Sequence, residues 1–342
     1  MNPIPEGAFW VRMPRFIGDG IMISQALEPL RQQLGTPLVA WGPGSVLDLY
    51  DGCNAFAAVA QDERLGRRAW TLARVLRRHR AAGVISLTRS LRPLLAGWIA
   101  RTPLRIGWAE KGGNHLATHS MSFLADRSTH HIDRYQILLR RAFPDLVACP
   151  PVPLRPRPEA EQAAQTLLGR EGLRPGFVAC GIGGNEWNKR LGSDIWMEVL
   201  QALGQEGFQI ALLGHGQEDA RLAEDLVARY PGTRNLVGQL KLSETAALLG
   251  QAGALIGNDS ALPHLAAAVG CPVVTMFGPT RPEWTAPRGT RVRVVRRDDL
   301  PCVPCAVHGC SVPGHPCMNQ LAPAAILQAL HDVFDPRTVH EP

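Results

Sequence analysis

The stretch AGALIGNDSALPHLAAAVGCPVVTMFGPT, residues 252–280, places two short apolar runs on either side of a longer amphipathic segment. We expect strands over residues 252–259 and 272–279, with a helix over residues 261–269 between them. A strand, a crossover helix and a second strand form the repeating unit of parallel sheets that are covered by helices. The same alternation continues along the chain, so the sequence predicts the α/β class.

Two series of such units predict two domains. Expected strands of the first half lie at residues 8–13, 37–41, 82–87 and 103–108, with helices near 21–34, 65–79, 89–99 and 131–142. Those of the second half lie at residues 176–184, 208–216, 252–259, 272–279 and 291–295, with helices near 193–203, 218–229, 243–250 and 261–269. Between the halves, CPPVPLRPRPEA (residues 149–160) has five prolines in twelve residues, which favours an extended linker. We therefore expect two Rossmann-like domains, residues 1–150 and 151–342, with parallel sheets facing a central cleft.

Composition is consistent with this division. The chain has 342 residues and is 45% apolar, enough for two cores of about 150 residues each. Near the N-terminus no apolar stretch resembles a secretory signal, and no segment approaches the roughly 18 apolar residues of a membrane span. We expect a soluble cytoplasmic protein.

The formal net charge of +6 is concentrated in one part of the chain. Basic residues crowd the segment between Arg64 and Lys111, where Glu110 is the single acid. They are Arg64, Arg67, Arg68, Arg74, Arg77, Arg78, Arg80, Arg89, Arg92, Arg101, Arg105 and Lys111. Such a patch favours phosphates, acidic sugars or an anionic membrane surface, although arginine that merely solubilises the protein gives the same pattern. Nucleic acid is not expected as a partner, because aromatic residues do not interleave with the arginines and no binding motif accompanies them.

The turn after the strand that ends at Ile256 predicts a phosphate site. Residues 257–260 separate this strand from a helix with Pro263 in its first turn, where a missing N–H costs little. Free backbone N–H groups at a helix N-terminus bind anions, and His264 could add a donor. The alternative is that Asp259 or Ser260 is an ordinary N-cap and His264 an ordinary helix residue.

Two further loops follow strands of the second half. In CGIGGNEWNKRLGSDIW (residues 180–196), glycines permit close backbone approach, and Lys189 and Arg190 could neutralise a departing diphosphate. The spacing is not that of a P-loop. In LLGHGQEDARL (residues 212–222), Glu218 begins a helix, where it could accept from ribose hydroxyls or simply interact with the helix dipole.

Several segments together resemble one known family. RMPRFIGDGIMISQALEPLR (residues 12–31), NKR (188–190), the run from Asn235 to Thr280 and CVPCAVHGCSVPGHPCM (302–318) look like the ADP-heptose:lipopolysaccharide heptosyltransferases of glycosyltransferase family 9, especially the heptosyltransferase II branch. The resemblance implies a GT-B fold, with the acceptor in the N-terminal domain and the nucleotide sugar in the C-terminal domain. It also implies inverting, metal-independent heptose transfer from ADP-heptose to an acidic inner-core glycolipid, with peripheral contact at the cytoplasmic face of the inner membrane.

The same resemblance implies roles for single residues. Asp19 matches the family's general base, which takes a proton from the acceptor hydroxyl; the alternative is that it only caps a helix starting near Gly20. Lys189 matches the family's lysine at the donor phosphates, Glu218 the acid near the ribose, and Leu240 the apolar residue against the adenine. The loop and helix that hold the diphosphate and sugar in the family are matched by Asp259, Ser260, Ala261 and His264. This chain has Ala261 where the family commonly has glycine, and Leu262 and Pro263 also depart from the common pattern.

Four of the eight cysteines form a compact group near the C-terminus. Cys302, Cys305, Cys310 and Cys317 have the spacing C-x2-C-x4-C-x6-C, which suits a tetrathiolate site for structural zinc or iron. His308 and His315 offer alternative ligands, and a reduced, empty loop is an equal alternative. The scattered Cys53, Cys149, Cys180 and Cys271 are expected in the core.

Other functions remain open from the sequence alone. Within the same class, the donor could be another nucleotide sugar and the acceptor another glycan or a protein. A nucleotide-sugar epimerase has a similar two-domain pattern, but it would need a second set of active-site acids. A non-catalytic binding protein would not need Asp19.

Overall fold

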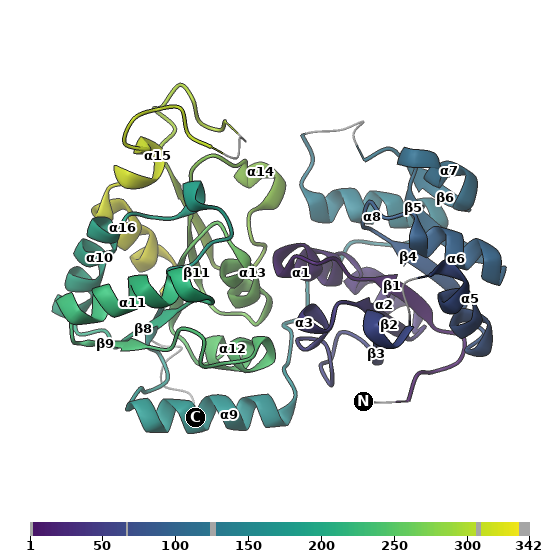
Figure 1. Cartoon of the computed structure of the whole chain (residues 1–342), viewed down its shortest axis with the longest axis horizontal. Helices are drawn as coiled ribbons and strands as arrows, with labels where there is room; N and C mark the ends of the chain where they lie inside the picture. Colours follow the sequence, from purple (N-terminus) through teal and green to yellow (C-terminus); the bar gives the residue numbers. More distant parts are fainter. Residues whose placement is uncertain (1–2, 66–67, 124–127, 306–308, 335–342) are drawn as a thin grey trace. The chain divides into compact units, whose positions relative to one another are not determined.

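The computed structural model describes residues 3–65, 68–123, 128–305 and 309–334, and divides into two units, Met1–Arg157 and Pro158–Pro342 (Figure 1). Each unit contains a six-stranded parallel sheet with helices on both faces. The expected α/β class is confirmed.

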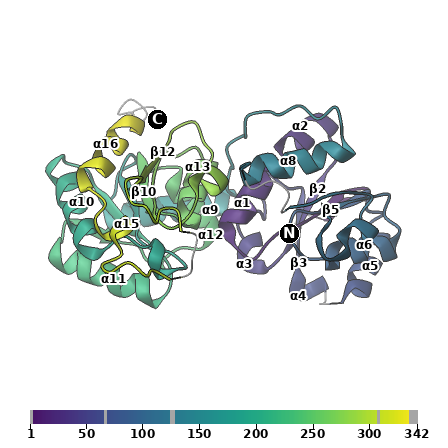
Figure 2. The same ribbon diagram turned by 90° about the horizontal axis from the view of Figure 1, so that it is seen from above.

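The first sheet has the order β3-β2-β1-β4-β5-β6. Its strands are β1 (Phe9–Arg12), β2 (Leu38–Gly42), β3 (Ala58–Gln61), β4 (Gly83–Ser86), β5 (Leu104–Trp108) and β6 (His119–Met121). The helices are α1 (Ile17–Ala26), α2 (Glu28–Leu34), α3 (Gly44–Leu47), α4 (Asp62–Leu65), α5 (Ala69–Arg78), α6 (Arg92–Ala100), η1 (Glu110–Gly112), α7 (Gly113–Leu116) and α8 (His131–Ala142). Helices α5 and α6 cover one face of the sheet and α1 and α8 the other (Figure 2). Buried Trp10 and Trp41 fill the core beneath α5 and α6.

The second sheet has the order β12-β11-β10-β7-β8-β9. Its strands are β7 (Val178–Gly181), β8 (Ile210–Leu213), β9 (Thr233–Asn235), β10 (Ala254–Asn258), β11 (Val273–Phe277) and β12 (Val292–Arg296). The helices are α9 (Pro158–Glu171), η2 (Trp187–Lys189), α10 (Ser193–Gln205), α11 (Gln217–Arg229), α12 (Leu242–Leu249), α13 (Ala261–Ala268), α14 (Pro282–Thr285), α15 (Pro316–Asn319) and α16 (Pro323–Val333). The stretch 252–280 forms the predicted β10-α13-β11 unit, with Leu255 opposite Val273 in parallel register.

Some elements differ from the expectations. The helix expected over residues 21–34 is two helices that meet at Leu27, and the first begins at Ile17. Strands β3, β6 and β9 were not expected; each lies at a sheet edge and has only three or four residues, too few for a clear apolar run. Helix α9 begins at Pro158, inside the expected linker, because proline is well tolerated in a first helical turn. None of the helices in the described ranges is both long and apolar enough to cross a membrane.

Candidate active site

The carboxyl ends of β7 and β10 form the centre of the second unit's site. These strands are neighbours in the sheet, and the following strands are added outward from them in opposite directions. Open α/β sheets bind ligands at the point where the strand order reverses in this way. Asn258, which is fully buried, joins the loops here: its amide donates to the carbonyls of Ile182 (2.9 Å) and Gly183 (3.1 Å), and its oxygen accepts from the backbone N–H of Leu191 (3.1 Å). The glycine loop is therefore fixed against the end of β10.

A buried acid joins the loops after β7 and β8. Asp219, 4% exposed, accepts from the backbone N–H of His215 at 2.8 Å. Its carboxylate packs so closely on Gly183 that a Cβ at that position would lie 2.1 Å from Oδ2. Glycine is therefore required there for the close approach of this carboxylate, whereas the expected approach of a diphosphate to the loop stays a prediction. Asp219 itself was missed, because an acid in a first helical turn resembles an ordinary surface residue.

Arg190 connects this acid to the glycine loop. Its guanidinium lies 2.9 Å from Asp219 and 3.1 Å from Glu218, and it donates to the carbonyl of Gly184 (2.9 Å from Nε). Glu218 is 75% exposed, so its carboxylate is accessible to a ligand despite this contact. Arg190 thus fixes the loop beside Lys189.

Lys189 is paired with the acid at the start of α13. Its Nζ lies 3.0 Å from Oδ2 of Asp259, and the same oxygen accepts a hydrogen bond from Thr280 (2.6 Å). The Lys189 side chain is 22% exposed and that of Asp259 10%. The structure therefore brings together two of the predicted donor residues, one cation and one anion.

The remaining predicted donor residues lie at the start of α13 and in the loop before α12. Ser260 occupies the N-cap position of α13 but makes no side-chain capping bond, so the expectation of an ordinary cap is wrong for its hydroxyl. Ala261 is half-buried and His264 is 5% exposed, deep in the helix. Leu240 is half-buried in the loop between β9 and α12, which is tied to the loop after β8 by the bond from Gly238 N–H to the Gly214 carbonyl (3.2 Å).

Asp19 lies in the first unit, in the first turn of α1 just after β1. The helix begins at Ile17, so the alternative that Asp19 caps a helix near Gly20 is wrong. Its half-buried carboxylate lies close enough to Tyr135 of α8 to add to the effect of burial, which raises the pKa of that phenol. Phe16, at the N-cap position of α1, is 63% exposed.

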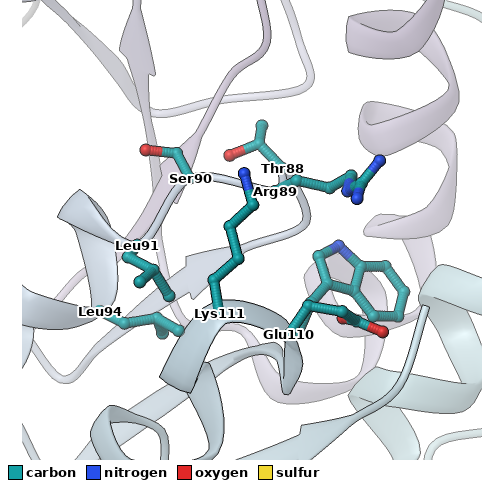
Figure 3. A pocket seen from close by; sticks show the side chains of 8 residues that line it. Thr88, Arg89, Ser90, Leu91, Leu94, Glu110 and Lys111 are labelled. Atoms are coloured by element: carbon teal, nitrogen blue, oxygen red, sulfur yellow. The ribbon is translucent and has the colours of Figure 1, made fainter. Parts of the chain in front are cut away.

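A surface pocket follows β4 and β5 in the same unit (Figure 3). It is lined by Thr88, Arg89, Ser90, Leu91, Leu94, Trp108, Glu110 and Lys111. Lys111 extends across it toward the loop of Thr88 to Ser90. Its backbone is left-handed (φ 55°), followed by Gly112 at φ 86° and by Gly113, where a Cβ would lie 1.9 Å from the Trp108 carbonyl. A tight glycine turn therefore fixes the lysine.

The basic segment has one more counter-charge than expected. Asp62 lies 2.8 Å from Arg12 and 3.4 Å from Arg92 and accepts from the Trp41 indole at 3.1 Å. Glu110 is thus not the only acid near the basic residues. The expectation that aromatic residues do not interleave with the arginines is also wrong, because Trp70 and Trp98 lie among them and are exposed. Arg67 and the Arg64 side chain lie outside the described residues.

The cysteine group gives a mixed result. Burial raises the pKa of Cys317 to about 11, and the nearby thiols of Cys310, Cys305 and Cys302 raise it in the same direction. The four thiols are close in space, yet among the residues described no group of three His, Cys, Asp or Glu side chains is placed to hold a metal ion. Three of the four scattered cysteines are buried as expected, whereas Cys149 is only partly so.

The two histidines proposed as alternative ligands near the cysteine group differ in their surroundings. His308 lies outside the described residues. His315 is 7% exposed and packs edge-on against Trp187 with ring centroids 5.2 Å apart. The cysteine loop therefore contacts the loop that carries Lys189.

Known proteins resemble this chain over much of its length. The sequence matches Glycosyltransferase family 9 (heptosyltransferase) over residues 69–315. The chain belongs to glycosyltransferase family 9. Lipopolysaccharide heptosyltransferase 2 of Salmonella typhimurium is 28% identical over 226 residues, covering 61% of this chain and 63% of that protein. Lipooligosaccharide heptosyltransferase 2 of Campylobacter jejuni is 20% identical over 96% of this chain and 99% of its own.

A solved heptosyltransferase structure supports the expected architecture. The E. coli ADP-heptose lps heptosyltransferase II has a TM-score of 0.77 and 22% identity, covering 95% of this chain and 98% of that one. The predicted GT-B fold and membership of this glycosyltransferase family are confirmed. The expected central cleft stays a prediction.

Proposed function

We propose that this family 9 protein transfers heptose from ADP-heptose to an acidic lipopolysaccharide inner-core acceptor, with inversion at the anomeric carbon. The observation that carries the proposal is the pair of Lys189 and Asp259, 3.0 Å apart at the carboxyl ends of β7 and β10. Relatives that span most of this chain are heptosyltransferases, and the E. coli relative is named for ADP-heptose. The epimerase and the non-catalytic binding protein are not favoured by this family membership.

The donor is proposed to lie across the second unit's site. Lys189 would exchange Asp259 for the diphosphate, whose negative charge also suits the N–H groups at the start of α13. Glu218 would accept from the ribose, and Leu240 would pack on the adenine. Ser260, Ala261 and His264 would border the diphosphate and the sugar; the Ala261 methyl group leaves less room there than glycine would.

The proposed heptose transfer needs one general base, and ADP is its leaving group. Asp19 takes the proton of the acceptor hydroxyl as its oxygen attacks the anomeric carbon, and the bond from that carbon to ADP breaks on the opposite face. Lys189 stabilises the negative charge that develops on the departing ADP. Asp19 in the first turn of α1 is suited to hold a negative charge before the transfer, because a helix N-terminus favours anions. No cofactor takes part.

The acceptor is proposed to place an acidic group in the pocket of Arg89 and Lys111. Arg89 and Lys111 are both exposed, and Thr88 and Ser90, which carry hydroxyl groups, line the same pocket. Two cations with adjacent hydroxyl donors suit a carboxylate or a phosphate. Such an acceptor would be met at the cytoplasmic face of the inner membrane.

The cysteine group is proposed to take up structural zinc or iron. What supports this is the closeness of the four thiols to one another. In the part of the chain that the structure describes, their side chains are not placed to bind one ion together, so metal binding would require the loop to change its conformation. Metal analysis of protein purified without chelators tests this proposal.

Calorimetric titration with ADP, UDP and GDP tests the donor. Preference for ADP supports ADP-heptose; preference for another nucleotide would keep the transferase and change its donor. The next measurement is ADP release with and without an added inner-core acceptor. Acceptor-dependent release supports transfer, whereas donor turnover without an acceptor would point to an epimerase and no turnover to a binding protein.

A further inference from the structure

Phe16 places a phenyl ring in solvent at the start of α1. Its side chain is 63% exposed and its backbone is extended. Its carbonyl accepts from the N–H of Gly20 at 3.1 Å, so the backbone begins the helix without help from the ring. The N-cap position favours small polar side chains that bond to the first free N–H groups, and the Phe16 side chain makes no such bond. The ring therefore neither caps the helix nor fills the core, and it is available to a ligand.

Phe16 and Asp19 lie on the same side of the first turn of α1. Phe16 is the N-cap residue, and Asp19 is the third residue of the helix. Residues at these two positions face each other across the first turn, which is the geometry that a capping box uses. Gly18, between them, adds no side chain to this turn. A molecule that presents a hydroxyl to Asp19 therefore meets the ring of Phe16.

Arg15 adds a positive charge beside the ring. Two other arginines that follow or end strands of this sheet, Arg12 and Arg92, lie 2.8 and 3.4 Å from Asp62 and are paired with it. Arg15 is exposed and has no ion-pair partner among the residues that the structure describes. Its charge is therefore available to an acidic ligand that lies on the ring.

The same sheet edge carries the proposed acceptor pocket. Strands β1 and β4 pair in parallel, so the loops that follow them leave the sheet side by side. Trp108 lines the pocket and packs on Tyr135 with ring centroids 6.0 Å apart, and Tyr135 is the phenol that Asp19 approaches. The pocket and the first turn of α1 are therefore two parts of one surface of the first unit.

We propose that Phe16 and Arg15 hold the sugar whose hydroxyl attacks the donor. A sugar ring has a face of C–H groups that packs on an aromatic ring, while its hydroxyls point outward to polar groups. The Phe16 ring takes that face, Arg15 pairs with a carboxylate of the same sugar, and the attacking hydroxyl is turned toward Asp19. Charged groups on both sides of the ring favour a sugar over a purely apolar partner. The inference rests on the proposed function, because it names the part of the acceptor that is held at the base.

Saturation-transfer NMR tests the contact without a donor. The probe is a deacylated inner-core oligosaccharide whose terminal sugar has a carboxylate. Irradiation of the aromatic protons of the protein should transfer saturation to the C–H protons of that sugar. F16L should remove most of this transfer, because leucine has no aromatic protons, and F16W should retain it. The matched control W98L removes a ring that is 56% exposed in the last turn of α6, which leads to the start of β5 at the opposite sheet edge, and should leave the transfer unchanged.

Steady-state kinetics with the same oligosaccharide, at saturating ADP-heptose, test the effect on transfer. F16L should raise the KM for the oligosaccharide about three- to tenfold, the range expected for an aromatic contact, with kcat within about twofold of the wild type. F16W should stay close to the wild type. R15Q should raise the same KM about two- to fivefold at low salt and less at high salt. Its control is R78Q, which removes an exposed arginine in the last turn of α5 that has no ion pair within the described residues.

Three results would overturn the proposal. Unchanged saturation transfer and KM in F16L would remove the ring from the acceptor site. A rise in the KM for ADP-heptose instead of the oligosaccharide would assign the ring to the donor, and equal losses in F16L and W98L would show a general effect of exposed rings. Circular dichroism melting confirms that each variant folds. Because the NMR contact is measured without ADP-heptose, a contact without turnover would contradict heptose transfer and keep this sugar site, while transfer by F16L at the wild-type KM would do the reverse.

Discussion

Nζ of Lys189 lies 3.0 Å from Oδ2 of Asp259, so the cation of the donor loop is held by the acid at the start of α13. This pair keeps a positive charge at the place where the proposed diphosphate would arrive. Asp259 is itself fixed by Thr280, which donates to the same oxygen. A ligand with two phosphates can replace one carboxylate at Lys189 and gain the α13 N–H groups as well.

Lys189→Ala should weaken ADP binding roughly 10- to 100-fold, the usual effect of losing a charge-assisted hydrogen bond. Titration calorimetry measures the change. Arg174→Ala is the control, since it removes an exposed cation of the same unit in the loop between α9 and β7. Equal ADP affinity for wild type and Lys189→Ala would remove Lys189 from the donor site.

Asp19→Asn should lower turnover between about 100- and 10,000-fold, because the amide cannot take the acceptor proton. ADP affinity should stay close to that of the wild type, since the proposed ADP contacts all belong to the second unit. Acceptor-dependent ADP release measures the turnover. The control Asp145→Asn removes an exposed acid of the first unit; a similar loss in both variants would point to a general charge effect instead of base catalysis.

Much of this arrangement could be predicted because it rests on local patterns. The strand, turn and helix around Asp259 have a strong apolar periodicity, and Asp19 and Lys189 lie in motifs that the family resemblance makes recognisable. Asp219 and Asp62 could not be predicted, because their importance arises from contacts with residues distant in sequence, as in the 2.8 Å pair of Asp62 and Arg12.

The exposure of two tryptophan side chains could not be predicted from the sequence either. Trp70 and Trp98 have the helical spacing of core residues relative to their neighbours, and only the packing of α5 and α6 on the sheet reveals that both face outward. The short strand β9 was missed for a related reason: its residues Thr233 to Asn235 are mostly polar, and pairing with β8 at the sheet edge stabilises them.

Gly183→Ala should lower the free energy of unfolding of the second unit by about 1–3 kcal/mol, the typical cost of overpacking. The new methyl group would lie against the buried Asp219 carboxylate, 2.1 Å from Oδ2 before any relaxation. Urea unfolding measures the change. Gly169→Ala is the matched control: residue 169 lies in α9, its new methyl group would have no neighbouring atom within 4 Å among the described residues, and the change should stabilise by about 0.5–1 kcal/mol. Equal effects would contradict the close packing at Gly183.

The stability of the metal-free protein should fall as the pH rises from about 9 through 11. The Cys317 thiol has its pKa raised from 9.0 to about 11 by burial and by the other three thiols. A raised pKa means that the folded state holds the proton more tightly, so this contribution is complete below the unfolded pKa and is lost as the pH passes the folded one. Cys317→Ser should show a shallower decline in urea unfolding over this range. An unchanged slope would show that the pKa of this thiol is the same in the folded and the unfolded protein.

Arg89→Gln combined with Lys111→Gln should raise the KM for an acidic acceptor by at least about tenfold, because each charge-assisted contact is worth a factor of this order. The effect on ADP affinity should be small, since both residues line the pocket of the first unit. Steady-state assays with varied acceptor, at saturating donor, separate KM from kcat. Arg174→Gln and Arg221→Gln together provide the charge-matched control in the second unit. If both double variants raised KM equally, the overall charge of the protein and not this pocket would determine acceptor binding. A rise confined to the variant of Arg89 and Lys111 would assign the acidic group of the acceptor to the pocket that these two residues line.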